Sequence, residues 1–160
     1  MDISQLVEII PGIIIFRISS VEFCINIKDV QLIKRTEEFE LLQNGGSIGT
    51  SQVMIHNINV PLIDISEKFN LSFEKSFDQR MILLVKHHSE EDNLEKTFGL
   101  IVDEVIELVI TERNDDNHLL KFIPKGDNPF ISGSIFIENR EILLPNYLKI
   151  ASVSVLNNSV

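Results

Sequence analysis

Tryptophan is absent from this sequence, and cysteine occurs only once, at Cys24. A single cysteine excludes an internal disulfide and a thiolate metal cluster. Alternation along the chain places Phe23 and Ile25 on one face of a predicted strand and Cys24 on the other. Because no base lies near Cys24 in the sequence to activate its thiol, we expect this residue to have a structural role.

Basic residues are also scarce. Lysine and arginine number 14 against 24 aspartates and glutamates, which gives a formal net charge of -10 and a pI of about 4.8. Nucleic acids and anionic membrane surfaces both select for a basic stripe, so neither is an expected partner. The acidic balance favours a solvated, self-repelling surface, and a basic patch on a protein partner is the functional alternative.

No apolar run in the sequence is long enough to span a bilayer. Residues 1–12 contain no lysine or arginine and no cleavage-site pattern, so a secretory signal is not expected and the cytoplasm is the predicted location. Apolar residues recur at helical spacing in the N-terminal segment, residues 1–11, and predict a short helix that packs on the body or binds a partner: Ile3, Leu6, Val7 and Ile10. The tail, residues 153–160, is expected to fray.

Short apolar runs separated by polar loops cover the rest of the chain. Their spacing, roughly 8 to 12 residues, predicts an all-β fold with about ten strands and few helices. Residues 86–97 are predicted to form a charged loop between two strands. The segments 60–64 and 142–146 resemble each other, because each is an apolar strand that leads into a helical turn. We therefore expect one domain, residues 12–152, built from two lobes on a single plan.

The clearest hairpin joins strands 52–55 and 58–63 through His56-Asn57, since asparagine tolerates the left-handed conformation of a tight turn. Pro61 within the second strand predicts an edge position or a bulge. Asp64, with Glu67 three residues later, resembles a capping box and predicts a short helix through Phe69.

The most informative stretch is residues 98–108. Gly99 opens a strand in which Phe98, Leu100 and Val102 share one face and Ile101 lies on the other. Asp103-Glu104 interrupts the apolar residues and cannot lie unpaired in a dry core, so the chain is expected to bend or to reach the surface there.

This stretch closely resembles the glycine, apolar, valine-aspartate, x-valine signature of the CheW-like chemotaxis coupling domain. Further segments resemble that family in order and spacing, from about Ile13 to Ala151: Phe16-Arg17-Ile18 through Val30-Gln31, Ile58 to Asp64, and Ile131-Ser132-Gly133. The resemblance implies two small SH3-like five-stranded β-barrel lobes packed together, with short helices.

The resemblance also implies a function. Domains of this family are non-catalytic adaptors that bridge the regulatory domain of a chemotaxis histidine kinase and the cytoplasmic tip of chemoreceptors. No cofactor, metal, nucleic acid or membrane insertion is expected. Binding is expected to use apolar strand faces with polar rims.

Two residues depart from the family pattern at the presumed contact surface. His56 replaces an arginine and Leu32 replaces a glutamate, so a permanently charged fork and an acidic residue are both absent. The partner-binding surface is predicted to contain these positions and their apolar neighbours, which core packing would explain equally well: Leu32, Ile55, His56, Asn57, Ile58 and Val60. Ile58→Glu separates the two interpretations, because it abolishes solubility if Ile58 is buried and only binding if Ile58 is exposed. His56 would make binding sensitive to pH near 6 to 7, and an affinity that is flat from about pH 5.5 to 8 would exclude this.

Two other hypotheses remain. The chain is a divergent adaptor for pilus-based motility or another non-flagellar signalling array, or it is an acidic β-barrel hydrolase using His56, Asp64 and Asp103. The adjacent His87 and His88 point to opposite faces of a strand and do not favour a shared metal ion.

Overall fold

A computed structural model of the chain describes residues 12–38, 40–43, 51–55, 57–89, 94–110, 122–124 and 128–151. The predicted N-terminal helix in residues 1–11, the tail 153–160 and His56 lie outside the described residues.

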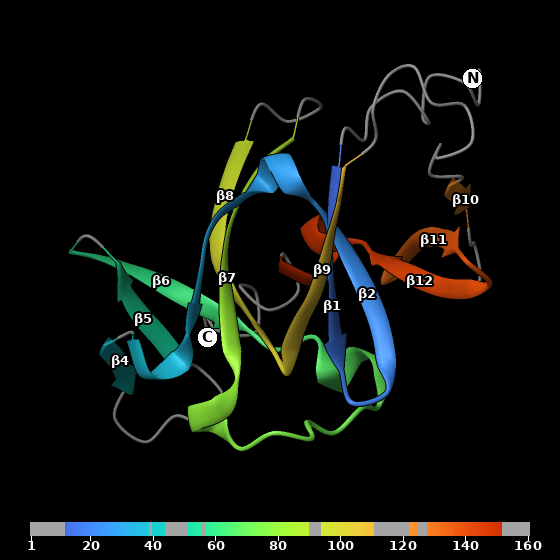
Figure 1. Cartoon of the computed structure of the whole chain (residues 1–160). Coiled ribbons are helices and arrows are strands. Elements are labelled where there is room, and N and C mark those ends of the chain that lie inside the picture. The colour runs from blue at the N-terminus through green and yellow to red at the C-terminus, as the bar shows by residue number, and fades with distance from the viewer. Residues whose placement is uncertain are drawn as a thin grey trace.

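Two antiparallel-rich sheets make up the fold (Figure 1). The first has the order β10-β11-β12-β2-β1-β9, with β1 (Gly12–Ile18), β2 (Val21–Asn26), β9 (Glu104–Ile110), β10 (Phe122–Pro124), β11 (Ile131–Ile137) and β12 (Arg140–Pro145). The second has the order β3-β7-β8-β6-β5-β4, with β3 (Val30–Arg35), β4 (Glu40–Gln43), β5 (Ser51–Ile55), β6 (Ile58–Ile63), β7 (Met81–Ser89) and β8 (Leu94–Val102). Short helical turns join them: η1 (Ile27–Asp29), η2 (Thr36–Glu38), η3 (Ser66–Phe69), η4 (Phe77–Gln79) and residues 147–151.

The two sheets repeat one plan. In each, two hairpin-linked strands lead to a single parallel contact, Leu143 beside Phe23 in the first sheet and Leu62 beside Gly99 in the second. The second strand of each hairpin, β12 or β6, makes the parallel contact and then leads into a helical turn. This shared arrangement explains the sequence similarity between 60–64 and 142–146. The prediction of an all-β fold with two lobes is confirmed, although each sheet has six strands among the described residues where five were predicted for each lobe.

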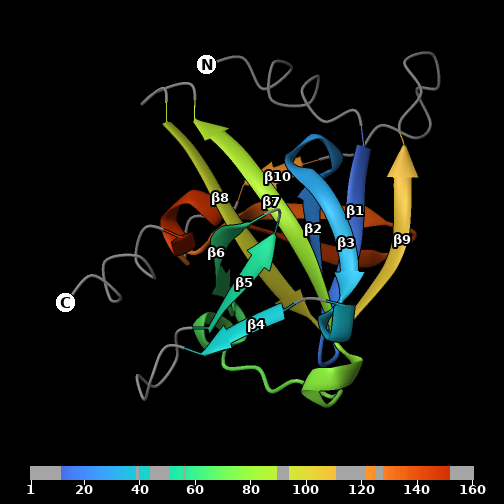
Figure 2. The ribbon, with the colours of Figure 1, turned by 90° about the vertical axis from the view of Figure 1, so that its left-hand side faces the viewer.

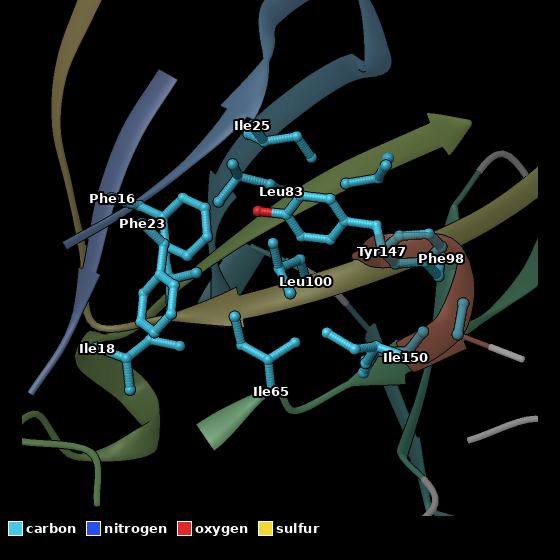
Figure 3. Close-up of a cluster of buried hydrophobic side chains, with 14 of the residues drawn as sticks. Phe16, Ile18, Phe23, Ile25, Ile65, Leu83, Phe98, Leu100, Tyr147 and Ile150 are labelled. Atoms are coloured by element: carbon cyan, nitrogen blue, oxygen red, sulfur yellow. The ribbon is translucent and has the colours of Figure 1, made fainter. Parts of the chain in front are cut away.

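A shared core lies between the lobes (Figure 3). It combines β1 and β2 residues such as Phe16 and Phe23 with β7 and β8 residues such as Leu83 and Leu100. The Tyr147 ring packs into it and donates a hydrogen bond of 2.7 Å from its hydroxyl to the backbone carbonyl of Cys24. The predicted alternation in β8 is confirmed, because Phe98, Leu100 and Val102 face this shared core.

Each lobe also has its own smaller core on the opposite face of these strands. Cys24 packs with residues of the first lobe, and its predicted structural role agrees with its complete burial, which raises the pKa of its thiol to about 12. Ile101 packs into the core of the second lobe, which we call the second-lobe core: Val53, Ile55, Val60, Ile82 and Ile101. The central strands are therefore buried on both faces.

The predicted charged loop at residues 86–97 is wrong. β7 continues to Ser89, and β8 begins at Leu94, so the two strands extend as a polar ribbon beyond the cores. Lys86 and Glu95 form an ion pair of 3.0 Å along this ribbon. The pairing of β7 with β8 continues without a break from the buried part of the two strands into this ribbon. A polar composition alone therefore does not end a strand.

Pro61 does not lie at the edge of the sheet or in a bulge, because β6 has β5 on one side and β8 on the other. Its pairing with β8 begins only at Leu62. Alternation in the ladder to β5 turns the nitrogen of Pro61 away from that strand, towards the side where no ladder partner exists at this position. The missing donor is therefore tolerated.

The helix predicted after Asp64 is present as the single 3-10 turn η3, but it begins at Ser66. The Asp64 side chain accepts hydrogen bonds from the backbone N–H and the hydroxyl of Ser66. It closes a local turn ahead of the helix in place of the predicted capping box.

Candidate partner-binding surface

The β5–β6 hairpin has the predicted two-residue turn. Ile55 pairs with Ile58, and Asn57 adopts a left-handed conformation with a φ of 65°. That conformation costs most residues roughly 1–2 kcal/mol but is accessible to asparagine. The hairpin therefore has the tight turn that its sequence predicts.

Substitution of Asn57 tests this turn. We expect Asn57→Val to lower the free energy of unfolding by about 1–2 kcal/mol, because a β-branched residue resists positive φ. Asn57→Gly should leave stability unchanged or raise it slightly, since glycine has no such penalty. Urea denaturation of both variants measures the difference, and equal losses would contradict a left-handed turn residue.

The structure divides the predicted surface residues into two groups. Ile58 is 65% exposed and Asn57 is also exposed, so both face solvent at the hairpin tip. Ile55 and Val60 are buried in the second-lobe core, and Leu32 on β3 packs partly buried against the same cluster. For Ile55 and Val60 the structure therefore favours the core interpretation, and they support the tip from beneath.

Ile58 is an extension of the second-lobe core. Directly opposed residues share a face in an antiparallel pair, so Ile58 lies on the same face as Ile55 and Val60. It extends past the end of the packed region, and its side chain is left uncovered by the described residues. An exposed apolar residue beside a tight hairpin turn is suited to enter a pocket of a partner protein.

A second group of exposed apolar side chains was not predicted. Leu108 and Ile110 lie on β9, the edge strand of the first sheet, and are 52% and 63% exposed. The sequence presents them as part of an apolar run, and only the sheet order shows that β9 has a neighbour on one side alone among the described strands. The molecule therefore exposes apolar residues on both lobes.

The Asp103 carboxylate connects the lobes. It lies between β8 of the second sheet and β9 of the first, and its residue is fully buried. Its Oδ2 accepts hydrogen bonds from the N–H groups of Ser19 (2.7 Å) and Glu74 (3.0 Å), and its Oδ1 accepts one from Lys75 (2.9 Å). The Asp103 N–H donates in turn to the carbonyl of Arg17 at 3.1 Å. The chain bends here as predicted, but the carboxylate stays inside because backbone donors from two distant segments satisfy it.

Electrostatics agree with this structural role. Burial acts to raise the pKa of the Asp103 carboxyl. The three backbone hydrogen bonds, with the positive charge of Arg17, outweigh burial and lower that pKa below its usual value. The ionised form is therefore the one that holds the lobes together.

The proposed hydrolase residues do not form a free acid–base pair. Asp103 is occupied by backbone donors, and Asp64 accepts hydrogen bonds from Ser66. His56 lies outside the described residues. Within the described ranges, no three histidine, cysteine, aspartate or glutamate side chains form a group that could hold a metal ion.

An open cleft of about 610 Å³ lies on the first lobe, and its charged groups pair with one another. Arg17 contacts Glu104 at 2.9 Å, and Arg140 contacts Glu22 at 2.8 Å and Glu107 at 2.5 Å. These ion pairs neutralise the two guanidinium groups, and the rest of the lining includes the apolar residues Val21, Ile106 and Leu143, so the cleft does not favour an anionic substrate.

Close packing explains why a glycine occupies position 99 in the stretch 98–108. A Cβ atom at this position would lie 2.7 Å from Leu62 Cδ2 and 3.2 Å from Ile82 Cγ2. The missing side chain lets β6 lie against β8 without displacing the Leu62 side chain. Gly99 and Asp103 thus serve packing within the second lobe and the connection between lobes, respectively.

Comparison with known proteins agrees with this architecture. The model of the CheW-like domain matches residues 12–154. The crystal structure of the scaffolding protein TtCheW from Thermoanaerobacter tengcongensis is similar, with a TM-score of 0.63, 17% sequence identity, and coverage of 86% of this chain and 90% of that chain. No curated protein sequence matches. Among the described residues, no helix has the length and apolarity needed to cross a membrane.

Proposed function

Because the chain belongs to the family of CheW-like domains, we propose that it is a non-catalytic scaffold that couples chemoreceptors to a chemotaxis histidine kinase. The family match over residues 12–154 is the observation that carries this proposal. The structural neighbour TtCheW is itself described as a scaffolding protein. Such a protein acts through contacts alone, in the cytoplasm, without a cofactor.

A coupling protein needs at least two contact surfaces, and the fold offers an apolar one on each lobe. The β5–β6 hairpin, with Ile58 and Asn57 near its turn, projects from the second sheet (Figure 1), while β9 forms an edge of the first (Figure 2). We assign the kinase regulatory domain to the hairpin surface, to which we also assign Leu32 and His56, and the helical receptor tip to the exposed end of β9. Ile55 and Val60 contribute by holding the hairpin rigid.

Calorimetric titration against the regulatory domain of the chemotaxis kinase from the same organism tests the kinase contact. We expect saturable micromolar binding that Ile58→Glu weakens at least about tenfold, because a carboxylate would enter an apolar pocket unpaired. Since Ile58 is 65% exposed, solubility and the unfolding transition should not change.

Phe136→Glu is the matched control, because Phe136 is a large apolar residue that is 46% exposed on β11 of the other sheet. It should bind the kinase domain like the unmodified protein. Equal weakening by both substitutions would show a general charge effect, and no weakening by Ile58→Glu would exclude the hairpin as the contact.

A divergent adaptor for pilus-based motility or another non-flagellar array is the second candidate. The packing of Leu32 against the second-lobe core favours it, since an apolar residue occupies a position where the family commonly has glutamate. Titration against kinase domains of both kinds of array separates the candidates, because the cognate domain should bind at least about tenfold more tightly.

A further inference from the structure

The C-terminal end of β9 carries apolar side chains on the same face of the sheet as the shared core. Ile14 of β1 is buried in that core, and its partner in β9 is Leu108, so both lie on the same side of the sheet. Ile110, two residues further, shares that face. Leu108 and Ile110 are 52% and 63% exposed, so the described residues leave this end of the sheet uncovered.

The first described residue of the chain lies next to this surface. Gly12 begins β1 and pairs with Ile110. A Cβ at Gly12 would lie 3.3 Å from Ile27 Cγ2 and 3.6 Å from the Cα of Ile110, which shows how closely these residues approach. The N-terminal segment therefore joins β1 at a residue that pairs with Ile110 and lies close to Ile27.

Residues 1–11 have the composition that this surface requires. Ile3, Leu6, Val7 and Ile10 recur at the spacing of one helix face. The other stretch that adjoins Ile110, residues 111–121, is polar from Thr111 to His118, and its apolar side chains are Leu119 and Leu120. The N-terminal stretch has an apolar side chain at Ile10, two residues before Gly12, whereas Leu119 lies nine residues after Ile110, so the N-terminal stretch is the better candidate for an apolar cover.

Length and direction also fit. Ile3 to Ile10 would span about 10 Å along a helix, and Leu108 to Ile110 spans about 7 Å along a strand. Proline disfavours a helical conformation in the residue before it, so Pro11 would turn the chain between a helix and β1. A segment that reverses at this point runs back along β9.

We propose that residues 1–11 fold back, with an amphipathic helix that ends before Pro11, over Leu108 and Ile110 and cover the end of β9 within the same molecule. The consequence for binding rests on the proposed function: a receptor helix that docks on this end of β9 must first displace residues 1–11. The contact itself does not depend on that assignment.

Disulfide formation between introduced cysteines tests the contact. Cys24 is fully buried, so the double variant Leu6→Cys with Leu108→Cys contains only two accessible thiols. We expect a disulfide within the monomer under mild oxidation. The control pairs Leu6→Cys with Phe136→Cys, which places the second thiol at an exposed position on β11.

The Leu108 pair should oxidise at least about tenfold faster than the control pair, because the proposed contact raises the effective concentration of the two thiols. Equal rates would overturn the proposal. A disulfide that joins two molecules, seen as a dimer on a non-reducing gel, would also overturn it and show that a second copy covers β9.

A second measurement uses the chain without added cysteines. Leu6→Asp places a carboxylate on the apolar face, and Ser4→Asp is its control on the polar face. Only Leu6→Asp should accelerate hydrogen exchange of the β9 amides. If the receptor docks on β9, the same variant should also raise the affinity for a receptor-tip peptide by about fivefold or more. Fast disulfide formation without a change in affinity would support the contact and count against the proposed receptor site. Identical exchange in both variants would overturn the contact.

Discussion

Asp103→Asn is expected to lower the free energy of unfolding by about 2–3 kcal/mol, and Asp103→Ala by about 3–5 kcal/mol. In Asp103 both carboxylate oxygens accept hydrogen bonds from backbone N–H groups. Asparagine has only one such oxygen, so its NH2 group would face a backbone N–H donor that then has no acceptor. Alanine leaves three donors without their partner: the N–H groups of Ser19, Glu74 and Lys75. Urea denaturation at neutral pH measures both losses.

Glu104→Gln is the matched control, because Glu104 is adjacent to Asp103 and its side chain is 45% exposed in an ion pair with Arg17. An exposed pair of this kind contributes about 0–1 kcal/mol, so its loss should be small. If Asp103→Asn and Glu104→Gln cost the same, the burial and the backbone hydrogen bonds of Asp103 would not be the source of the effect.

The stability difference between the unmodified protein and Asp103→Asn should depend on pH. The pKa of Asp103 is lower in the folded protein than in the unfolded chain, where it is about 3.9. The ionised carboxylate therefore stabilises the fold fully at a pH above the unfolded-state pKa, and this stabilisation is lost as the pH falls through the folded-state pKa. We expect a constant difference in unfolding free energy from pH 8 to about pH 5 and a shrinking difference below about pH 4. A difference that grows on acidification would contradict a lowered pKa.

The alternation of residues in β8 was sufficient to predict which side chains face the shared core, because a two-residue period fixes the face of each residue in a strand. The same pattern indicated a bend at Asp103. It did not predict burial there, since the donors come from the β1–β2 turn and from the segment between η3 and η4. Contacts that tertiary structure supplies leave no local signal in the sequence.

The candidate surface shows a similar limit. Alternation places Ile55, Ile58 and Val60 on one face of the hairpin, but whether each is buried depends on where the second-lobe core ends. Ile58 lies just beyond that end, and Ile55 lies just inside it. Likewise, the exposed residues of β9 depend on sheet order, which the sequence does not specify.

Gly99→Val is expected to destabilise the protein by about 3 kcal/mol, and Gly99→Ala by about 1 kcal/mol. Intrinsic preference opposes this result, because glycine in a strand is less favourable than alanine by roughly 0.5–1 kcal/mol. Steric exclusion should prevail, since a Cβ at this position would approach Leu62 Cδ2 to 2.7 Å. That atom ends a flexible side chain and can shift for alanine, whereas valine would also press against Ile82.

A double-mutant cycle identifies the clash as the cause. Leu62→Ala removes the atom that Gly99→Ala would contact, so the two losses of unfolding free energy should sum to at least about 0.5 kcal/mol more than the loss in the double variant. Leu62 and Gly99 are cross-strand partners, so their coupling reports the parallel contact between β6 and β8 directly. Strict additivity would mean that the contact with Leu62 is not the source of the loss. Coupling would instead identify the glycine of the signature stretch as the residue that lets the β5–β6 hairpin, and with it Ile58, join the second lobe.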